Sequence, residues 1–246
     1  MIEVEGKNVF TELAELVDPP HTALLLIDMQ RDFIEPDGLF GTLGIDLSMY
    51  AAARPLLGTL LAAARRSGIL VIHIQNTALP GRMSDSPAQI HFNLRMHESA
   101  RRDGPPLRYT IPGTPGHGFA DGFEPGEDEL VVRKYRSSGF WGTNLQMLLR
   151  SNGIETVVVG GCTTEGCVES TARDAIFNDF YVVVPEDCVA SDDRAQHEAS
   201  MLLMRHRFDL ASGDEIGRVW DDSATRLAKT DRQKTDRHNR EQPWAS

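Results

Sequence analysis

The chain has 246 residues, 41% of them hydrophobic, and a formal net charge of −11 at pH 7. This length and hydrophobic content are sufficient for one large α/β domain with its own core. The negative charge makes nucleic acids and anionic membranes poor partners. No apolar run is long enough for a membrane helix, and the first ten residues lack the apolar segment of a secretory signal. The three cysteines, an odd number, argue against a disulfide framework and favour a reducing, cytoplasmic location.

Short apolar runs alternate with helical patterns along the chain, which predicts a mostly parallel sheet with helices on both faces. The first run, at 22–27, has no polar face, as in a central parallel strand, and it stops at Asp28. Further strands are expected at 69–74, 130–132, 157–159, 181–184 and 208–210, and helices at 50–67, 144–151, from 167, and at 195–206. Residues 1–221 are predicted to form a single domain, and the polar segment 222–246 to be a disordered tail.

The segment 77–128 has the weakest periodicity in the chain, yet it contains several apolar side chains. A long stretch of this kind is often a lid or a subunit contact. Its apolar residues need a surface to bury against, so we expect a homo-oligomer, a dimer or a tetramer, in which this segment helps to cover the site. The residues concerned are Ile90, Phe92, Leu94, Met96, Leu107, Tyr109 and Ile111.

The sequence VVVGGCTTEGCV, at 157–168, reads as a strand, a glycine pair and a small polar turn that leads into a helix. Cys167 is expected at or near the start of that helix. There, unpaired N–H groups and the helix dipole favour negative charge, so the thiol is expected to tend towards thiolate. The alternative is that Cys167 is a small buried core residue, as most free cysteines are. Cys162 and Cys188 are interpreted as structural.

Three predicted strands end in residues whose chemistry is complementary: Asp28, Lys134 and the turn before Cys167. The carboxyl ends of parallel strands share one edge of a sheet, where α/β proteins place their sites. A carboxylate there can take the thiol proton as a general base, and a lysine cation stabilises both anions. Backbone N–H groups of the turn can hold an oxyanion.

Three motifs resemble those of the isochorismatase-like cysteine hydrolases, over about residues 20–215. They are LLLIDMQRDF (24–33), VVRKYRSSGFWGT (131–143) and GGCTTEGCVESTARDA (160–175). The resemblance implies that Asp28, Lys134 and Cys167 form a catalytic triad and that no cofactor is needed. It also implies a cis peptide bond at Cys162–Thr163, with the N–H groups of Thr163 and Cys167 as the oxyanion hole.

Sequence differences between members of this family indicate which substrate each member cleaves. Nicotinamidases carry a metal cluster after the second strand, where this chain reads HIQNTALPG, so we expect no metal and interpret His73 as a core or edge residue. Cys167 argues against the vinyl ether cleavage of true isochorismatases, which lack it. The turn TTEGCV resembles N-carbamoylsarcosine amidohydrolases, whereas Gln75, Asn76 and the RSSGF segment resemble ureidoacrylate amidohydrolases.

The resulting prediction is an amidohydrolase that cleaves a C–N bond of a small N-carbamoyl or ureido acid through a thioester on Cys167. An isochorismatase-type, biuret or cyclic-amide hydrolase, or a non-catalytic binding protein of the same fold, remains an alternative. Asn76 and Gln30 are predicted to bind polar substrate groups, although loop hydrogen bonding would equally explain them. The predicted pocket walls are Phe33, Phe140 and Trp141, with core packing as the alternative, and Arg136 is predicted to pair with a substrate carboxylate unless it is solvated.

Overall fold

The computed structural model describes residues 1–96 and 107–225. Its main sheet has seven strands in the order β5-β4-β3-β6-β7-β9, with β8 paired to β6 outside this path. Every pairing in this sheet is parallel, which confirms the predicted fold class. The strands are β3 (Thr22–Ile27), β4 (Leu70–Asn76), β5 (Leu130–Lys134), β6 (Thr156–Cys162), β7 (Tyr181–Pro185), β8 (Val189–Ala190) and β9 (Asp209–Ala211).

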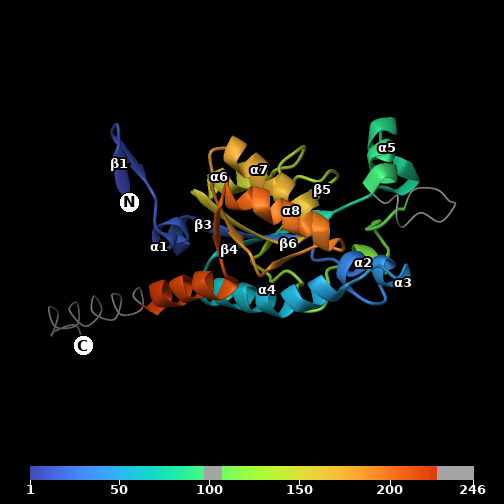
Figure 1. Ribbon diagram of the computed structural model, residues 1–246, viewed down its shortest axis with the longest axis horizontal. Coiled ribbons are helices and arrows are strands. Elements are labelled where there is room, and N and C mark those ends of the chain that lie inside the picture. The colour runs from blue at the N-terminus through green and yellow to red at the C-terminus, as the bar shows by residue number, and fades with distance from the viewer. Residues whose placement is uncertain (97–106, 226–246) are drawn as a thin grey trace, which may run out of the picture.

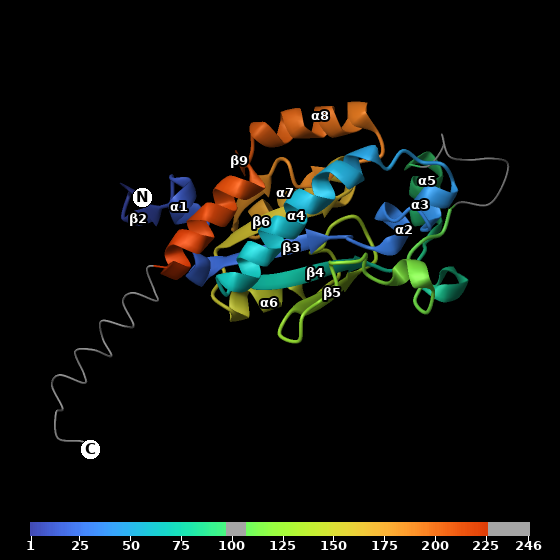
Figure 2. The same ribbon diagram turned by 90° about the horizontal axis from the view of Figure 1, so that it is seen from below.

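Helices cover both faces of the sheet, as predicted (Figures 1 and 2). One layer holds α4 (Ser48–Arg66) and a helix at 213–225. The other holds α6 (Leu145–Ser151), α7 (Glu169–Phe177) and α8 (Arg194–Arg205). None of the helices in the described ranges is long and apolar enough to cross a membrane.

Strand β3 explains why the sheet has two separate cores. Successive side chains of a strand point to opposite faces. Leu24 and Leu26 therefore enter the core under α4, whereas Leu25 and Ile27 enter the core under α6, α7 and α8. A strand buried on both faces needs an unbroken apolar run, which is the pattern that the sequence shows.

The chain order of the strands places a topological switch point between β3 and β6. From β3 the sheet grows outward through β4 and β5, and from β6 it grows in the opposite direction through β7 and β9. In open α/β sheets, ligands bind outside the carboxyl ends of the strands at such a point. Asp28 follows β3 directly, and the turn before Cys167 follows β6, so both border this position.

Several short elements were not predicted from the sequence. They are the hairpin β1 (Ile2–Val4) and β2 (Lys7–Val9), the helices α1 (Leu13–Leu16), α2 (Arg31–Ile34), α3 (Leu39–Thr42) and α5 (Pro87–Met96), and 3₁₀ turns at Pro19–His21, Pro80–Arg82 and Pro115–His117. In both views α5 and α3 lie at the same end of the molecule, and Figure 1 shows a gap between them (Figures 1 and 2).

The boundary predicted for the polar tail is wrong at 222–225, because these residues belong to the helix at 213–225. Trp220 anchors this helix: its side chain is fully buried and its Nε1 donates to Val17 O at 2.9 Å. Ser223 Oγ donates to Asp18 Oδ1 at 3.3 Å. The rest of the predicted tail, 226–246, lies outside the described residues.

Candidate active site

Asp28 directly follows β3 and has an unusual backbone conformation. Its φ of 52° lies in the left-handed region, which residues other than glycine seldom occupy. Its N–H donates to Ile74 O at 2.9 Å, and its carbonyl accepts the N–H of Gln30 at 2.7 Å. The side chain is almost fully buried. The chain therefore turns sharply out of the sheet at the residue that carries the predicted general base.

Lys134 ends β5 opposite Asn76, its register partner at the end of β4. Its side chain is fully buried, and its Nζ lies 2.8 Å from Asp28 Oδ2 and 3.1 Å from Cys167 Sγ. Nζ also donates to Arg136 O at 3.2 Å and to Asn76 Oδ1 at 3.4 Å. The structure thus brings the carboxylate, the ammonium and the thiol together, as the sequence predicts.

The turn that carries Cys167 depends on close contact between β6 and β3. Gly161 has a φ of 124°, and a Cβ at this position would lie 2.2 Å from Ile27 O, so only glycine fits. The peptide bond Cys162–Thr163 is cis, as the resemblance implied. Thr164–Val168 then form a π-helical turn that runs into α7, so Cys167 lies in the first turn of the helical segment.

Burial and the neighbouring charges together determine the pKa values of these three groups. It raises the pKa of Asp28, although the Lys134 ammonium opposes the rise. It also raises the pKa of the Cys167 thiol to about 12, again against the effect of Lys134 and with the Asp28 charge adding to it. Burial alone would lower the pKa of Lys134, but the charges of Asp28 and Cys167 raise it above its ordinary value of 10.5.

The expectation that Cys167 tends towards thiolate is therefore wrong for the resting site. In this buried site the Lys134 cation can compensate the charge of one anion. If the Asp28 carboxylate and a Cys167 thiolate were both present, one negative charge would be left without a partner. The ion pair with Asp28 already supplies the one anion, so the thiol keeps its proton until the carboxylate takes it. The effect of a nearby helix start is smaller than the cost of burying a second charge.

A cavity of about 150 Å³ opens beside the thiol. Its lining includes Asp28, Phe33, Phe40, Asn76, Phe92, Met96, Tyr109, Cys162, Thr163, Cys167 and the acidic side chains Glu165, Asp192 and Asp193. A second, adjoining cavity shares Asn76, Phe92, Tyr109 and Cys167 with the first, and it adds Arg108 and Arg136. Asp85 lines the second cavity as well, so Cys167 lies between an acidic wall and a wall that carries two arginines and one aspartate.

Two of the predicted substrate contacts, Phe33 and Asn76, line the first cavity, and Arg136 lines the second. Thr163 and Cys167, the predicted oxyanion residues, both line the first. Tyr109, Phe92 and Met96 were not predicted as site residues; the only signal was the apolar content of 77–128. Their presence supports a covering role for this segment within one chain, of which 97–106 lies outside the described residues.

The structure places the other three predicted contacts elsewhere. Gln30 is fully buried: its Nε2 donates to Asn76 O at 3.1 Å and His117 O at 2.9 Å, and its Oε1 accepts from Asn76 N at 2.8 Å. Its amide thus joins the end of β4 to the turn at His117 and lines neither cavity. Phe140 packs in the core under α7, and Trp141 is 63% exposed beneath the Arg136 guanidinium.

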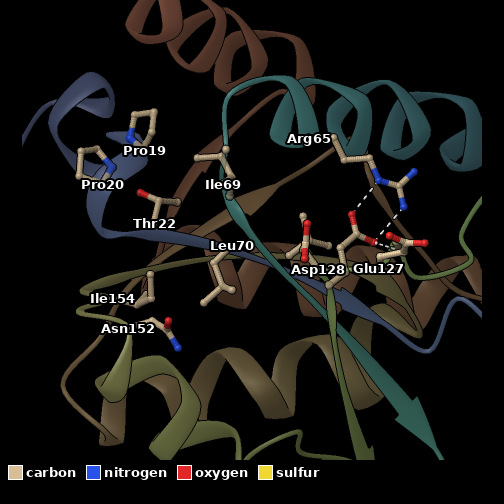
Figure 3. Close-up of a pocket in the computed structure, with 14 residues that line it drawn as sticks. Pro19, Pro20, Thr22, Arg65, Ile69, Leu70, Glu127, Asp128, Asn152 and Ile154 are labelled. Carbon is tan, nitrogen blue, oxygen red and sulfur yellow. Dashed lines mark hydrogen bonds and ion pairs between the residues drawn. The ribbon is translucent and has the colours of Figure 1, made fainter. Parts of the chain in front are cut away.

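A larger cavity, of about 640 Å³, lies at the opposite edge of the sheet, where the strands begin (Figure 3). It is lined by proline, aliphatic and acidic side chains, with Arg65 bound to Glu129 at 2.7 Å. No cysteine, histidine or lysine is among its lining residues, all of which the structure describes. Reactive chemistry, rather than volume, therefore identifies the site at the carboxyl ends.

The described residues hold no group of three or more His, Cys, Asp or Glu side chains placed to bind a metal ion. His73 is fully buried in β4, and its Nε2 lies 2.8 Å from Glu129 Oε2. This is the core position that we expected for it.

Known proteins of similar sequence carry amidohydrolase names. The ureidoacrylate amidohydrolase of Enterobacter sp. strain 638 is 34% identical over 172 residues, which cover 69% of this chain and 75% of that protein. The maleamate amidohydrolase of Pseudomonas putida is 30% identical over 198 residues, which cover 80% and 83%.

Among solved structures, one relative carries an amidase name and another shows the same fold. The N-carbamoylsarcosine amidase of Thermoplasma acidophilum has a TM-score of 0.61 at 27% identity, with 79% of this chain and 97% of that one covered. A cysteine hydrolase from Pseudomonas syringae has the same fold, with a TM-score of 0.70 at 23% identity and coverage of 85% and 96%. The family model described as the isochorismatase domain matches residues 22–212, and the chain belongs to the isochorismatase family.

Proposed function

We propose that this chain is a cysteine amidohydrolase that cleaves a C–N bond of a small N-carbamoyl or ureido acid. The observation that carries the proposal is the position of the Lys134 ammonium, 2.8 Å from Asp28 Oδ2 and 3.1 Å from Cys167 Sγ, beside a cavity. A base, a cation and a nucleophile in mutual contact are the groups that acyl transfer requires.

The first step is a proton transfer within the buried site. Asp28 accepts the thiol proton, and the negative charge moves from the carboxylate to Cys167 Sγ while Lys134 stays within reach of both. The number of charges in the site does not change, so the transfer avoids the cost of creating a new buried charge. The thiolate then attacks the carbonyl carbon of the carbamoyl group.

The attack gives a tetrahedral intermediate, whose oxyanion the N–H groups of Thr163 and Cys167 would hold. As the intermediate collapses, Asp28 gives the proton to the departing nitrogen, and Cys167 keeps the rest of the carbamoyl group as a thiocarbamate, the thioester of a carbamic acid. Water, deprotonated by Asp28, hydrolyses the thioester and restores the thiol. None of these steps involves a cofactor.

The charges around the two cavities support a substrate with a carboxylate at one end and N–H groups at the other. Arg108 and Arg136 line the cavity beyond Asn76 and would attract a carboxylate. Glu165 and Asp192 line the opposite wall, where they would accept hydrogen bonds from a carbamoyl nitrogen. A simple acid amide is the second candidate, because one relative bears the name maleamate amidohydrolase.

A screen of ureido acids, N-carbamoyl amino acids, acid amides and biuret for ammonia release tests this proposal. Each acid should be assayed beside its methyl ester, which lacks the negative charge of the carboxylate and keeps the bond to be cleaved. Cys167→Ser should abolish turnover with the fold intact, because a serine hydroxyl is a far poorer nucleophile beside a carboxylate base. Activity of more than a few per cent in this variant would rule out Cys167 as the nucleophile.

We also propose that the protein acts as a homo-oligomer, a dimer or tetramer, in a reducing compartment such as the cytoplasm. All three cysteines are free, which is consistent with the compartment. Trp141 and Phe177 are large exposed side chains at 63% and 77%, and they line one surface depression beside the site, which a second subunit could cover. Light scattering tests the assembly: a fully active species at the 27.3 kDa monomer mass would rule it out.

A further inference from the structure

Thr110 is a fully buried residue with a backbone conformation that is rare for a side chain branched at Cβ. Its φ is 54°, in the left-handed region. Its N–H donates to Asp32 Oδ2 at 2.6 Å, and its carbonyl accepts the N–H of Ala78 at 3.1 Å. Such a conformation persists only where surrounding contacts hold it, and it is common beside functional sites.

The hydroxyl of Thr110 has two partners at short distance. It donates to Tyr109 O at 2.7 Å and accepts from Asn76 Nδ2, also at 2.7 Å. A hydroxyl has one hydrogen, so the bond to Tyr109 leaves it only acceptor capacity towards Asn76. The nitrogen of the Asn76 amide must therefore face Thr110.

This orientation determines what the other end of the amide presents to Lys134. With its nitrogen towards Thr110, Asn76 directs Oδ1 at the Lys134 ammonium, 3.4 Å away. The reversed amide would place N–H donors against a buried cation and leave the Thr110 hydroxyl without its donor. The Thr110 hydroxyl thus selects the orientation of Asn76 that is favourable for the cation.

Lys134 depends on such oxygen atoms because it is fully buried. Its Nζ lies within 3.4 Å of four groups: the Asp28 carboxylate, Cys167 Sγ, the carbonyl of Arg136 and the amide oxygen of Asn76. Two of these four groups, Arg136 O and Asn76 Oδ1, are neutral oxygens. Thr110 itself lines neither cavity, so it lies beyond the groups that can touch a substrate.

We propose that Thr110 is a positioning residue of the active site: its hydroxyl fixes the Asn76 amide and, through it, the ammonium of Lys134. The inference rests on the proposed function, in which Lys134 and Cys167 carry the reaction. It predicts that loss of one hydroxyl outside the pocket slows the chemistry while substrate binding is kept.

The test compares Thr110→Val, which removes the hydroxyl and keeps the shape, with Thr110→Ser, which keeps the hydroxyl. Thr114→Val is the matched control, because Thr114 is exposed on the same loop and its hydroxyl donates to Ile111 O at 2.8 Å and to no other group of the described residues. We expect Thr110→Val to lower kcat about tenfold with KM nearly unchanged, the size of one lost hydrogen bond in a charged network. The serine variant and the control should stay within about twofold of the wild type.

The rate of Cys167 alkylation by iodoacetamide, followed by mass spectrometry, gives a second readout that needs no substrate. It should fall in Thr110→Val and recover in Thr110→Ser. If no ureido acid or amide is hydrolysed, the proposed function fails, but the alkylation rates still test Thr110. Should the valine variant not fold, Thr110→Ala removes the same hydroxyl together with the branched side chain.

A double-mutant cycle with Asn76→Ala separates positioning from general stability. If Thr110 acts through Asn76, Thr110→Val should cause no further loss of kcat or alkylation rate in that background. Additive losses, a serine variant as slow as the valine variant, or a valine variant that alkylates at the wild-type rate would each overturn the proposal.

Discussion

Asn76 and Lys134 are register partners at the carboxyl ends of β4 and β5, and their side chains meet again beyond the sheet, where Nζ lies 3.4 Å from Oδ1. The pairing of β4 with β5 therefore determines where these two side chains lie in the active site. A shift of β5 by one residue would turn Lys134 to the other face of the sheet and remove its cation from Asp28.

Replacement of Lys134 by methionine tests whether the ion pair is needed for both stability and activity. Lys134→Met leaves the Asp28 carboxylate buried without a partner, which should lower the free energy of unfolding by about 3–5 kcal/mol and kcat/KM by at least about a hundredfold. The double variant Asp28→Asn with Lys134→Met should regain most of the stability and none of the activity. Urea denaturation and steady-state kinetics measure the two effects; a stable and active single variant would contradict the proposed role.

The pH dependence of kcat/KM follows from the direction of the pKa shifts. Burial raises the pKa of Asp28 above its ordinary 3.8, so activity should be lost, as the pH falls, at a higher pH than for an exposed aspartate. The raised pKa of Lys134 keeps the cation charged beyond pH 10.5, so no alkaline loss from this group is expected below that value. A profile that is already flat at about pH 4 would show that Asp28 is not the base.

Glu129 is expected to stabilise the fold without affecting catalysis. It accepts hydrogen bonds from Arg65 at 2.7 and 2.9 Å and from Gly126 N at 2.8 Å, and its pKa is lowered to about 2, with the Arg65 bonds as the main cause. Glu129→Gln should therefore lower the free energy of unfolding by about 1–3 kcal/mol at neutral pH and leave kcat unchanged.

The sign of the pH effect provides a check on this prediction. A carboxylate with a depressed pKa contributes stability above its ordinary value of 4.5, and that stability is lost as the pH falls towards about 2. The stability difference between Glu129→Gln and the wild type should therefore shrink over this range. Glu127→Gln, an exposed change on the same loop, is the control, and an equal loss in both variants would contradict the assignment.

Removal of divalent metal should leave activity unchanged. The proposed steps use only Asp28, Lys134, Cys167 and backbone N–H groups, and β4 ends in Gln75 and Asn76 rather than in a histidine and aspartate cluster. The measurement is ammonia release before and after dialysis against EDTA, with zinc added back. Activity that disappears on dialysis and returns with the metal would overturn the proposed mechanism.

The sequence by itself determined the sheet and the three reactive residues. Apolar runs without a polar face indicate buried parallel strands, and the residue at which each run stops lies at a known edge of the sheet. Asp28, Lys134 and the turn before Cys167 could therefore be placed at one edge before any coordinates were known. This inference needed only local periodicity, strand breaks and the rule that parallel strands share a direction.

Only the tertiary structure decided which neighbouring side chains serve the site. Gln30 was expected at the substrate, but its amide binds the carbonyl of His117, 87 positions along the chain, whereas Thr110, which no pattern singled out, binds Asn76. The protonation of Cys167 was likewise misjudged from the nearby helix start. The pKa of Cys167 depends on how deeply segments distant in sequence bury its Sγ. A local sequence pattern contains no information about that burial.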